Sequence, residues 1–123
     1  IKRVSGIEFE TGRSMMSATK LDDNDTVIGI SMMSATDVLS GNMKVILLTE
    51  GMASLAFPVE DVPELKKASR GVKAITFDKN DNALAFAGAF HARVETFTFN
   101  GKELSTRRVR MRQRAAKAQK AAL

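Results

Sequence analysis

The strongest pattern of hydrophobic and polar residues in the chain runs from Ser69 to Phe86. Residues 72–77 have the period-two pattern of a strand with one buried face. Polar residues 78–82 follow, and Asp and Asn favour turns because their side chains bond to the neighbouring backbone. A second apolar run extends to about Phe90. This segment is therefore predicted to form a strand, a polar turn and a second strand.

A weaker copy of this segment lies 56 residues upstream. When Leu21 is placed on Phe77, the flanking apolar positions correspond, and four pairs are identical: Ala18 with Ala74, Asp22 with Asp78, Asn24 with Asn80 and Asp25 with Asp81. Propeller-like arrays repeat at roughly 40 to 50 residues. The chain is therefore expected to contain two related β units.

Most of the remaining chain also has the pattern of strands. The run from Lys44 to Thr49 is almost continuously apolar, which suits a strand buried on both faces. Further strands are predicted at 1–9 with a break at Gly6, at 15–21, 26–33, 53–57 and 94–99, and in a return strand through Leu104, Val109 and Met111. Residues 43–90 then supply four strands, enough for one propeller blade. The predicted fold class is all-β.

Turn signals separate these strands. Asn100-Gly101 is among the strongest signals for a hairpin. Pro58 is expected to end its strand because it has no N–H group to donate, and residues 59–68 are expected to form a loop or one short helical turn. The other predicted turns lie at 11–12, 22–25, 38–42 and 50–51.

The net charge of +5 is concentrated at the C-terminal end. Residues 105–123 contain seven basic residues and no acidic one, whereas residues 1–104 contain twelve basic and fourteen acidic residues. The alanine-rich segment 113–123 has high helix propensity, but it lacks an apolar stripe and would be marginal as an isolated helix. This tail is expected to be frayed, or ordered only by packing or by a ligand.

The composition offers little for catalysis or for binding a metal or cofactor. There is no Cys, Tyr or Trp, and the single histidine, His91, is expected to be an exposed or half-buried hairpin residue. The acidic turn 22–25 is similar to a calcium loop, but Met33 occupies the position where a bidentate Glu would be needed. The seven methionines could form an adaptable binding surface, but they are interpreted as core filler.

The sequence gives no signal for a membrane. No run of about 18 apolar residues is present, so no membrane partner is expected. The first residue is Ile1 and no signal peptide is recognisable, which suggests a piece of a longer protein with a cytoplasmic location.

The basic tail is the strongest candidate binding site. Four of its arginines are spaced at period two and would project from one face of a strand, about 7 Å apart, where they could meet successive phosphates of a nucleic acid. The alternative is a solubilising tail or an anchor to an acidic protein surface. The candidate residues are Arg107, Arg108, Arg110, Arg112, Arg114, Lys117 and Lys120.

A second basic set lies in the body of the chain. Its members in the main repeat unit are Lys66, Lys67, Arg70 and Lys73, and Arg13 and Lys20 lie in the upstream copy. Recurrence at the same loop and strand edge would give a basic stripe along one side of the array, although scattered lysines are common on protein surfaces.

Several motifs resemble the C-terminal domain of the A subunit of bacterial type IIA topoisomerases. Segments 45–51, 57–59 and 67–75, with the Asp-x-Asn-Asp turn, look like one blade of that domain, and segments 1–9 and 18–22 look like the preceding blade. The ending at 99–105 with its basic tail is similar to the close of the topoisomerase IV A subunit in Gram-positive bacteria. The glutamine-arginine-glycine-rich box of gyrase A is absent, which favours topoisomerase IV without excluding gyrase.

The resemblance implies a β-pinwheel, a propeller-like ring of four-stranded blades that binds and bends duplex DNA along its basic outer rim. The chain would hold about two blades and a C-terminal hairpin: a partial blade at 1–42, a full blade at 43–90, a closing hairpin from 91 to 104, and a basic strand and tail at 105–123. The implied partners are duplex DNA, the remainder of the A subunit and the ATPase B subunit. The family's catalytic tyrosine belongs to its N-terminal region, so the chain is expected to be non-catalytic.

Two other classes of function are weighed against this one. The chain could be a structural or protein-interaction module without DNA affinity, whose exposed sheet edges pair with another copy by strand exchange. An enzyme is the third class, but no arrangement of residues that a reaction needs is recognisable.

Overall fold

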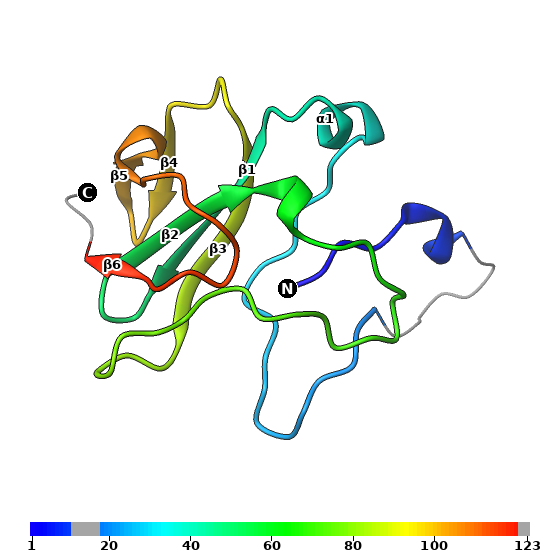
Figure 1. The fold of residues 1–123 in the computed structure, drawn as a ribbon, viewed down its shortest axis with the longest axis horizontal. Coiled ribbons are helices and arrows are strands. Elements are labelled where there is room, and N and C mark those ends of the chain that lie inside the picture. The colour runs from blue at the N-terminus through cyan, green and yellow to red at the C-terminus, as the bar shows by residue number, and fades with distance from the viewer. Residues whose placement is uncertain (11–17, 121–123) are drawn as a thin grey trace.

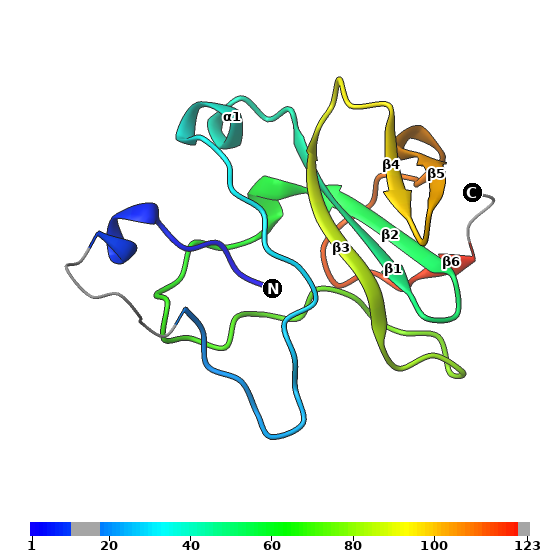
Figure 2. The same cartoon turned by 180° about the vertical axis from the view of Figure 1, so that it is seen from behind.

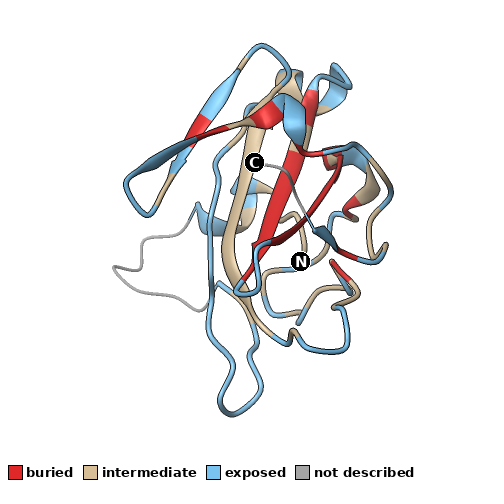
Figure 3. Ribbon diagram, turned by 90° about the vertical axis from the view of Figure 1, so that its left-hand side faces the viewer, coloured by how far each residue is buried: buried red, intermediate tan, exposed pale blue. Residues whose placement is uncertain are grey.

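The central hairpin of the molecule is formed by β1 (Met43–Thr49) and β2 (Ala53–Pro58). The computed structural model describes residues 1–10 and 18–120. Every residue of β1 except Lys44 is buried, which confirms the prediction of a strand covered on both faces. The turn between the strands and the end of β2 at Pro58 are also as predicted. Figure 3 shows that the buried residues concentrate in these two strands.

A four-stranded antiparallel sheet surrounds this hairpin in the order β3-β1-β2-β6. β3 (Leu84–His91) pairs with β1 along nearly its whole length, and β6 (Gln119–Lys120) pairs with Ala53 and Ser54 at the other edge. Figures 1 and 2 show the two edge strands on opposite sides of the hairpin. The fourth strand of the sheet therefore comes from the tail.

The predicted strand 72–77 is not part of this sheet, so residues 43–90 supply three of its strands and not four. Segment 72–77 instead runs beside the tail. The N–H group of Thr76 donates to the carbonyl of Ala116 at 3.0 Å, and the N–H group of Ala118 donates to the carbonyl of Thr76 at 2.9 Å. Thr76 is thus bonded to residues about forty positions further along the chain.

The alternating side chains of β1 divide the core into two clusters. Val45 and Leu47 pack on one face with Ala118 of the tail, and Ile46 and Leu48 pack on the other face with Val109. The tail therefore contributes to the core on both faces of the sheet. Methionine contributes less than predicted, because among the described methionines only Met43 is buried, and Met32, Met52 and Met111 are exposed.

A second hairpin, β4 (Thr96–Phe99) and β5 (Lys102–Ser105), covers the face that carries Ile46. Its Asn100-Gly101 turn is confirmed, and both residues have positive φ, 51° and 73°. The Phe97 ring packs against the rings of Phe86 and Phe90, with centroid distances of 5.0 and 5.6 Å.

The predicted return strand through Val109 and Met111 is wrong, because β5 ends at Ser105. The buried hydroxyl of Thr106 donates to the carbonyl of Val94 at 2.6 Å, and the chain continues as a short 3-10 helix, η3 (Thr106–Arg108). These contacts turn the chain out of the hairpin before Val109.

The N-terminal part of the chain contains fewer strands than predicted. Within 1–9, Arg3 forms an isolated bridge with Glu64, and the last four residues form the 3-10 helix η1 (Gly6–Phe9), which Ser5 caps. Segment 26–33 is extended but joins no sheet, and the Ser31 hydroxyl accepts a bond from the N–H of Ala89 in β3 at 3.2 Å. Residues 18–21 form no strand either, and residues 15–17 of that predicted strand lie outside the described residues.

Two short helices occur at loop positions, of which one was predicted. η2 (Val59–Asp61) follows β2, as expected for a short helical turn. α1 (Ala35–Leu39) was not predicted, and it is capped by the Ser34 hydroxyl, which accepts from the N–H of Asp37 at 3.1 Å. None of the helices in the described residues is long and apolar enough to cross a membrane.

Candidate nucleic-acid interface

Backbone hydrogen bonds hold the basic tail against the body of the molecule. The N–H of Arg112 donates to the carbonyl of Ala56 at 2.7 Å, and the N–H of Ala115 donates to the carbonyl of Ala74 at 2.9 Å. β6 then pairs with the edge of β2. The described part of the tail, up to Lys120, is therefore packed against the body, which is one of the outcomes left open by its sequence.

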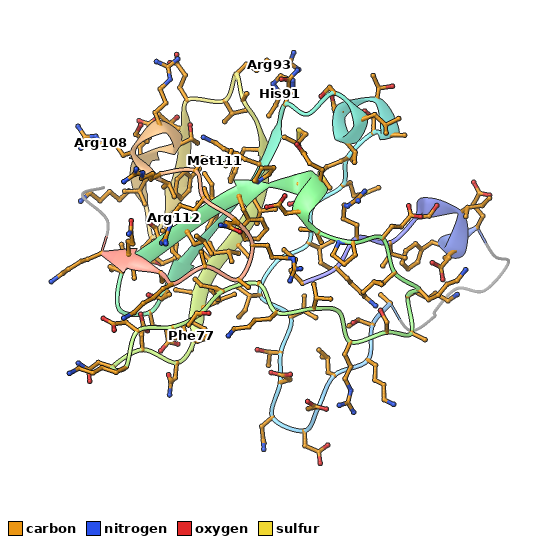
Figure 4. All side chains as sticks on the ribbon, viewed as in Figure 1. Phe77, His91, Arg93, Arg108, Met111 and Arg112 are labelled. Carbon is orange, nitrogen blue, oxygen red and sulfur yellow. The ribbon has the colours of Figure 1, made fainter. Side chains whose placement is uncertain are left out.

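The four arginines were predicted to project as one row from a strand. In the structure two of them are exposed and two are half-buried. Arg108 lies in η3 and not in a strand, and both Arg108 and Arg110 are exposed. Arg112 and Arg114 are half-buried and donate to backbone carbonyls, Arg112 to that of Lys117. Only part of the predicted row is thus directed to solvent. Figure 4 shows Arg108, Met111 and Arg112 along the tail near β5 and β2.

Two further tail cations form ion pairs at the surface. Arg107 lies 3.2 Å from a carboxylate oxygen of Glu95, and Lys117 lies 3.4 Å from one of Asp78. Both pairs are largely exposed, so each contributes little to stability and can exchange for a phosphate. A bond from the Lys79 N–H lowers the pKa of the Asp78 carboxyl, and Lys117 lowers it further.

Three other tail cations form no ion pair with a carboxylate of the described residues. Within residues 1–10 and 18–120, no carboxylate lies within ion-pair distance of Arg108, Arg110 or Lys120, and all three are exposed. Their charges are available to a polyanion without loss of an internal contact.

The body set gathers around the loop 66–73. Lys66, Arg70 and Lys73 are exposed on this loop, and Arg70 pairs with Asp22 at 2.8 Å. Lys67 is half-buried, and its amine donates to the carbonyl of Glu8 at 3.0 Å.

Lys20, from the upstream copy of the repeat, also contacts the loop 66–73. Its N–H donates to the carbonyl of Ser69 at 3.3 Å. Arg13, the remaining candidate, lies outside the described residues.

Sequence reasoning missed two lysines that shape this surface. The Lys2 amine donates to the carbonyls of Lys66, Lys67 and Ser69, at 3.1, 2.6 and 2.6 Å, and so fixes the curvature of the basic loop. Lys44 lies near Arg107 and donates to the carbonyl of Thr106 at 3.1 Å. Burial lowers the pKa of the Lys44 amine, and Arg107 lowers it further. No local motif marks either residue, because their partners are distant in sequence.

The remaining candidate features are structural. His91 is half-buried at the end of β3, and its Nδ1 atom accepts a bond from the N–H of Arg93 at 3.1 Å. Figure 4 shows both residues at the end of the molecule far from Phe77. The acidic turn 22–25 and its copy 78–81 are confirmed as turns, each closed by a bond of 3.1 or 2.9 Å. Among the described residues, no three Asp, Glu, His or Cys side chains converge as metal ligands.

Comparisons with known proteins agree with this architecture. No curated protein matches the sequence. Among solved structures, the chain is similar to the crystal structure of the C-terminal domain of DNA topoisomerase IV, with a TM-score of 0.73 and 16% identity. That similarity covers 95% of this chain and 36% of the other, so the chain spans about a third of the length of the protein it matches.

The sequence also matches the family described as DNA gyrase C-terminal domain, beta-propeller, at residues 2–32 and 57–87. These two segments make up half of the chain, and each contains one copy of the repeat in which Leu21 aligns with Phe77. The chain therefore belongs to the DNA gyrase C-terminal domain family and has its all-β, propeller-like pinwheel fold.

Proposed function

We propose that the chain binds and bends duplex DNA without reading its sequence, as a non-catalytic module of a topoisomerase A subunit. The observation that supports this most directly is the packed backbone of the tail, from which Arg108, Arg110 and Lys120 are exposed without ion-pair partners among the described residues. Arginine and lysine contacts to phosphate position a protein on DNA but carry no base information. The module would help the parent enzyme to hold a DNA segment for strand passage.

The full proposed interface joins the tail and the body set. It comprises Arg107, Arg108, Arg110, Lys117, Lys120, Lys66, Lys67, Arg70, Lys73 and Lys20, with Arg13 outside the described residues. Arg112 and Arg114 contribute to it chiefly by holding the tail, as their bonds to carbonyls indicate. The remainder of the A subunit and the ATPase B subunit are the proposed protein partners, in the cytoplasm.

Equilibrium binding to two unrelated duplexes of equal length tests this proposal. At about 50 mM salt we expect similar affinities for both, because the contacts are to phosphates. The affinity for a single strand of the same length, measured in parallel, shows whether binding depends on the duplex form. The proposal fails if neither duplex is bound, or if one is strongly preferred over the other.

A protein-interaction role is a second candidate, supported by a different observation. Large apolar side chains are exposed mainly in the N-terminal part of the chain, and Ile30 and Met32 are 83% and 96% exposed. Exposed apolar surface of this kind is typical of contacts with another part of an assembly. The other exposed large apolar residues in the N-terminal part are Ile7, Phe9, Leu21, Val27, Ile28 and Leu39. Sedimentation separates the two roles, because a self-associating chain with no DNA affinity supports the second.

A further inference from the structure

Arg114 occupies a junction between three segments of the chain. Its Nε atom donates to the carbonyl of Asp61 at 2.8 Å, and its Nη1 atom donates to the carbonyl of Lys73 at 2.7 Å. Its own N–H group lies 3.3 Å from a carboxylate oxygen of Asp61. One side chain thereby joins the η2 turn, the segment that begins at Lys73, and the tail.

These contacts differ from those expected of a residue that binds phosphate. Arg114 is half-buried, and two of its five N–H donors are already used on carbonyls. The rigid fork of donors in a guanidinium matches two separate acceptors, which a lysine amine could not reach together in the same geometry.

The chain next to Arg114 adopts a conformation that needs support. Ala115 has a φ of 67°, a left-handed conformation that is unfavourable for a residue with a Cβ atom. Its N–H donates to the carbonyl of Ala74, and the Thr76 hydroxyl donates to the Ala115 carbonyl at 2.7 Å. The bonds of Arg114 and Ala115 together lock the register between the tail and segment 73–76.

We propose that Arg114 is a positioning residue that holds the tail and the loop 66–73 as one surface, so that Lys73 on the loop and Lys117 on the tail meet the phosphates of one duplex together. This inference rests on the proposed DNA-binding function. Loss of the Arg114 contacts would let the tail separate from Lys73, and the two sets of cations would then bind independently and more weakly.

Substitution by lysine separates positioning from charge. Arg114→Lys keeps the positive charge but loses the paired carbonyl contacts. We expect its duplex affinity to fall about tenfold. The slope of its log affinity against log salt should become less steep, by the amount that about two phosphate contacts contribute. Arg93→Lys is the matched variant, because it makes the same exchange at an exposed arginine outside the proposed interface, and it should bind as the wild type does. Lys102→Ala, on the β4–β5 hairpin, serves as a control for general loss of charge.

For Asp61→Ala, an effect of charge and an effect on the attachment of the tail would change the DNA affinity in opposite directions. Removing a carboxylate near the interface should strengthen DNA binding if only charge matters. The Asp61 carboxylate accepts a bond from the Arg114 N–H, so if this bond also helps to hold the tail, binding should weaken instead. Thermal unfolding of each variant shows whether it remains folded, and hydrogen exchange at the Ala115 and Ala118 amides reports directly on whether the tail stays attached.

The outcomes distinguish this inference from the proposed function. If the wild type binds no duplex, the proposed function fails, while hydrogen exchange in Arg114→Lys still decides whether Arg114 holds the tail. The inference is overturned if Arg114→Lys binds DNA as the wild type does, or if its tail amides stay protected.

Discussion

The basic side chains of this molecule have two distinct uses. Lys2, Arg112 and Arg114 donate to backbone carbonyls and organise the chain, whereas Arg108 and Arg110 face solvent. A bond between a charged donor and a carbonyl is stronger than one between neutral groups, which suits it to hold loops that lack regular secondary structure.

Removal of the acid that pairs with Arg107 should strengthen DNA binding. Glu95→Gln keeps the shape of the side chain but releases Arg107, which lies 3.2 Å from the carboxylate. We expect the duplex affinity to rise about two- to fivefold, in keeping with the small energy of an exposed ion pair. Glu10→Gln makes the same change of charge far from the tail and is the control in a parallel titration. An equal effect of both variants would show that Arg107 does not contact DNA.

The lowered pKa of Lys44 predicts a specific dependence of stability on pH. Between the lowered pKa and the ordinary value of about 10.4, the folded protein binds fewer protons than the unfolded chain, so stability should rise as the pH rises through that interval. Urea unfolding at several alkaline pH values measures this effect. Lys44→Met should abolish the rise, and an unchanged pH profile in that variant would assign the effect to another group.

At the scale of elements, the tail is part of the folded body. Val109 is 3% exposed and packs in the cluster of Ile46 and Leu48, whereas Met111 two residues later is 49% exposed. The tail thus alternates between core contacts and solvent, and its short β6 strand covers an edge of β2 that would otherwise be open to another chain.

Truncation of Val109 should therefore destabilise the whole molecule. Val109→Ala removes buried methyl groups and is expected to lower the free energy of unfolding by about 1–3 kcal/mol. Met111→Ala, which removes more atoms from an exposed side chain, should change it by less than about 0.5 kcal/mol. Chemical denaturation of both variants gives the comparison. If Val109→Ala were as stable as wild type, the tail would not be part of the core.

The closure of the loop 62–72 over the N-terminal segment depends on Gly71. This residue has a φ of 93°, and an added Cβ would lie 2.6 Å from the carbonyl oxygen of Ile1. Gly71→Ala should destabilise the protein by about 1–3 kcal/mol, because it combines an unfavourable φ with a backbone collision. Gly6→Ala, where the site is open, is the matched control in thermal unfolding. Equal melting temperatures would contradict this account of the loop.

The elements that the sequence predicted correctly are those with local signals. The apolar run of β1 and the Asn100-Gly101 turn specify their structures within a few residues. The partner of segment 72–77 was not predictable in this way, because it lies in a tail without an apolar stripe and bonds through backbone groups that every sequence has. The helix α1 did have a signal, the Ser34-x-x-Asp37 cap, which the turn prediction overlooked.

The candidate site was predictable in composition but not in detail. The excess of cations in residues 105–123 is visible in the sequence, whereas the engagement of Arg114 depends on the carbonyls of Asp61 and Lys73, which are distant in sequence. The predicted division into a partial blade at 1–42, a full blade at 43–90, a hairpin from 91 and a tail from 105 stays a prediction. The sheet of β1, β2 and β3 nonetheless includes β6 of the tail.

At the scale of the whole molecule, the largest excess of positive charge lies in residues 105–123, away in sequence from the most exposed apolar side chains, Ile30 and Met32. The tail can therefore meet DNA while Ile30 and Met32 contact other protein surface. Lys20, which lies in the same N-terminal part as these apolar residues, belongs with the loop 66–73 to the proposed basic interface. The two proposed roles are therefore compatible within one assembly.

The most direct test of the central claim is the affinity of the whole chain for a duplex as a function of salt concentration. Each phosphate neutralised by Lys or Arg contributes about −0.9 to the slope of log affinity against log salt. With cations on both the tail and the loop engaged, we expect a slope between about −4 and −8, independent of the base sequence. A slope near zero, or no binding at the lowest salt concentration, would contradict the account.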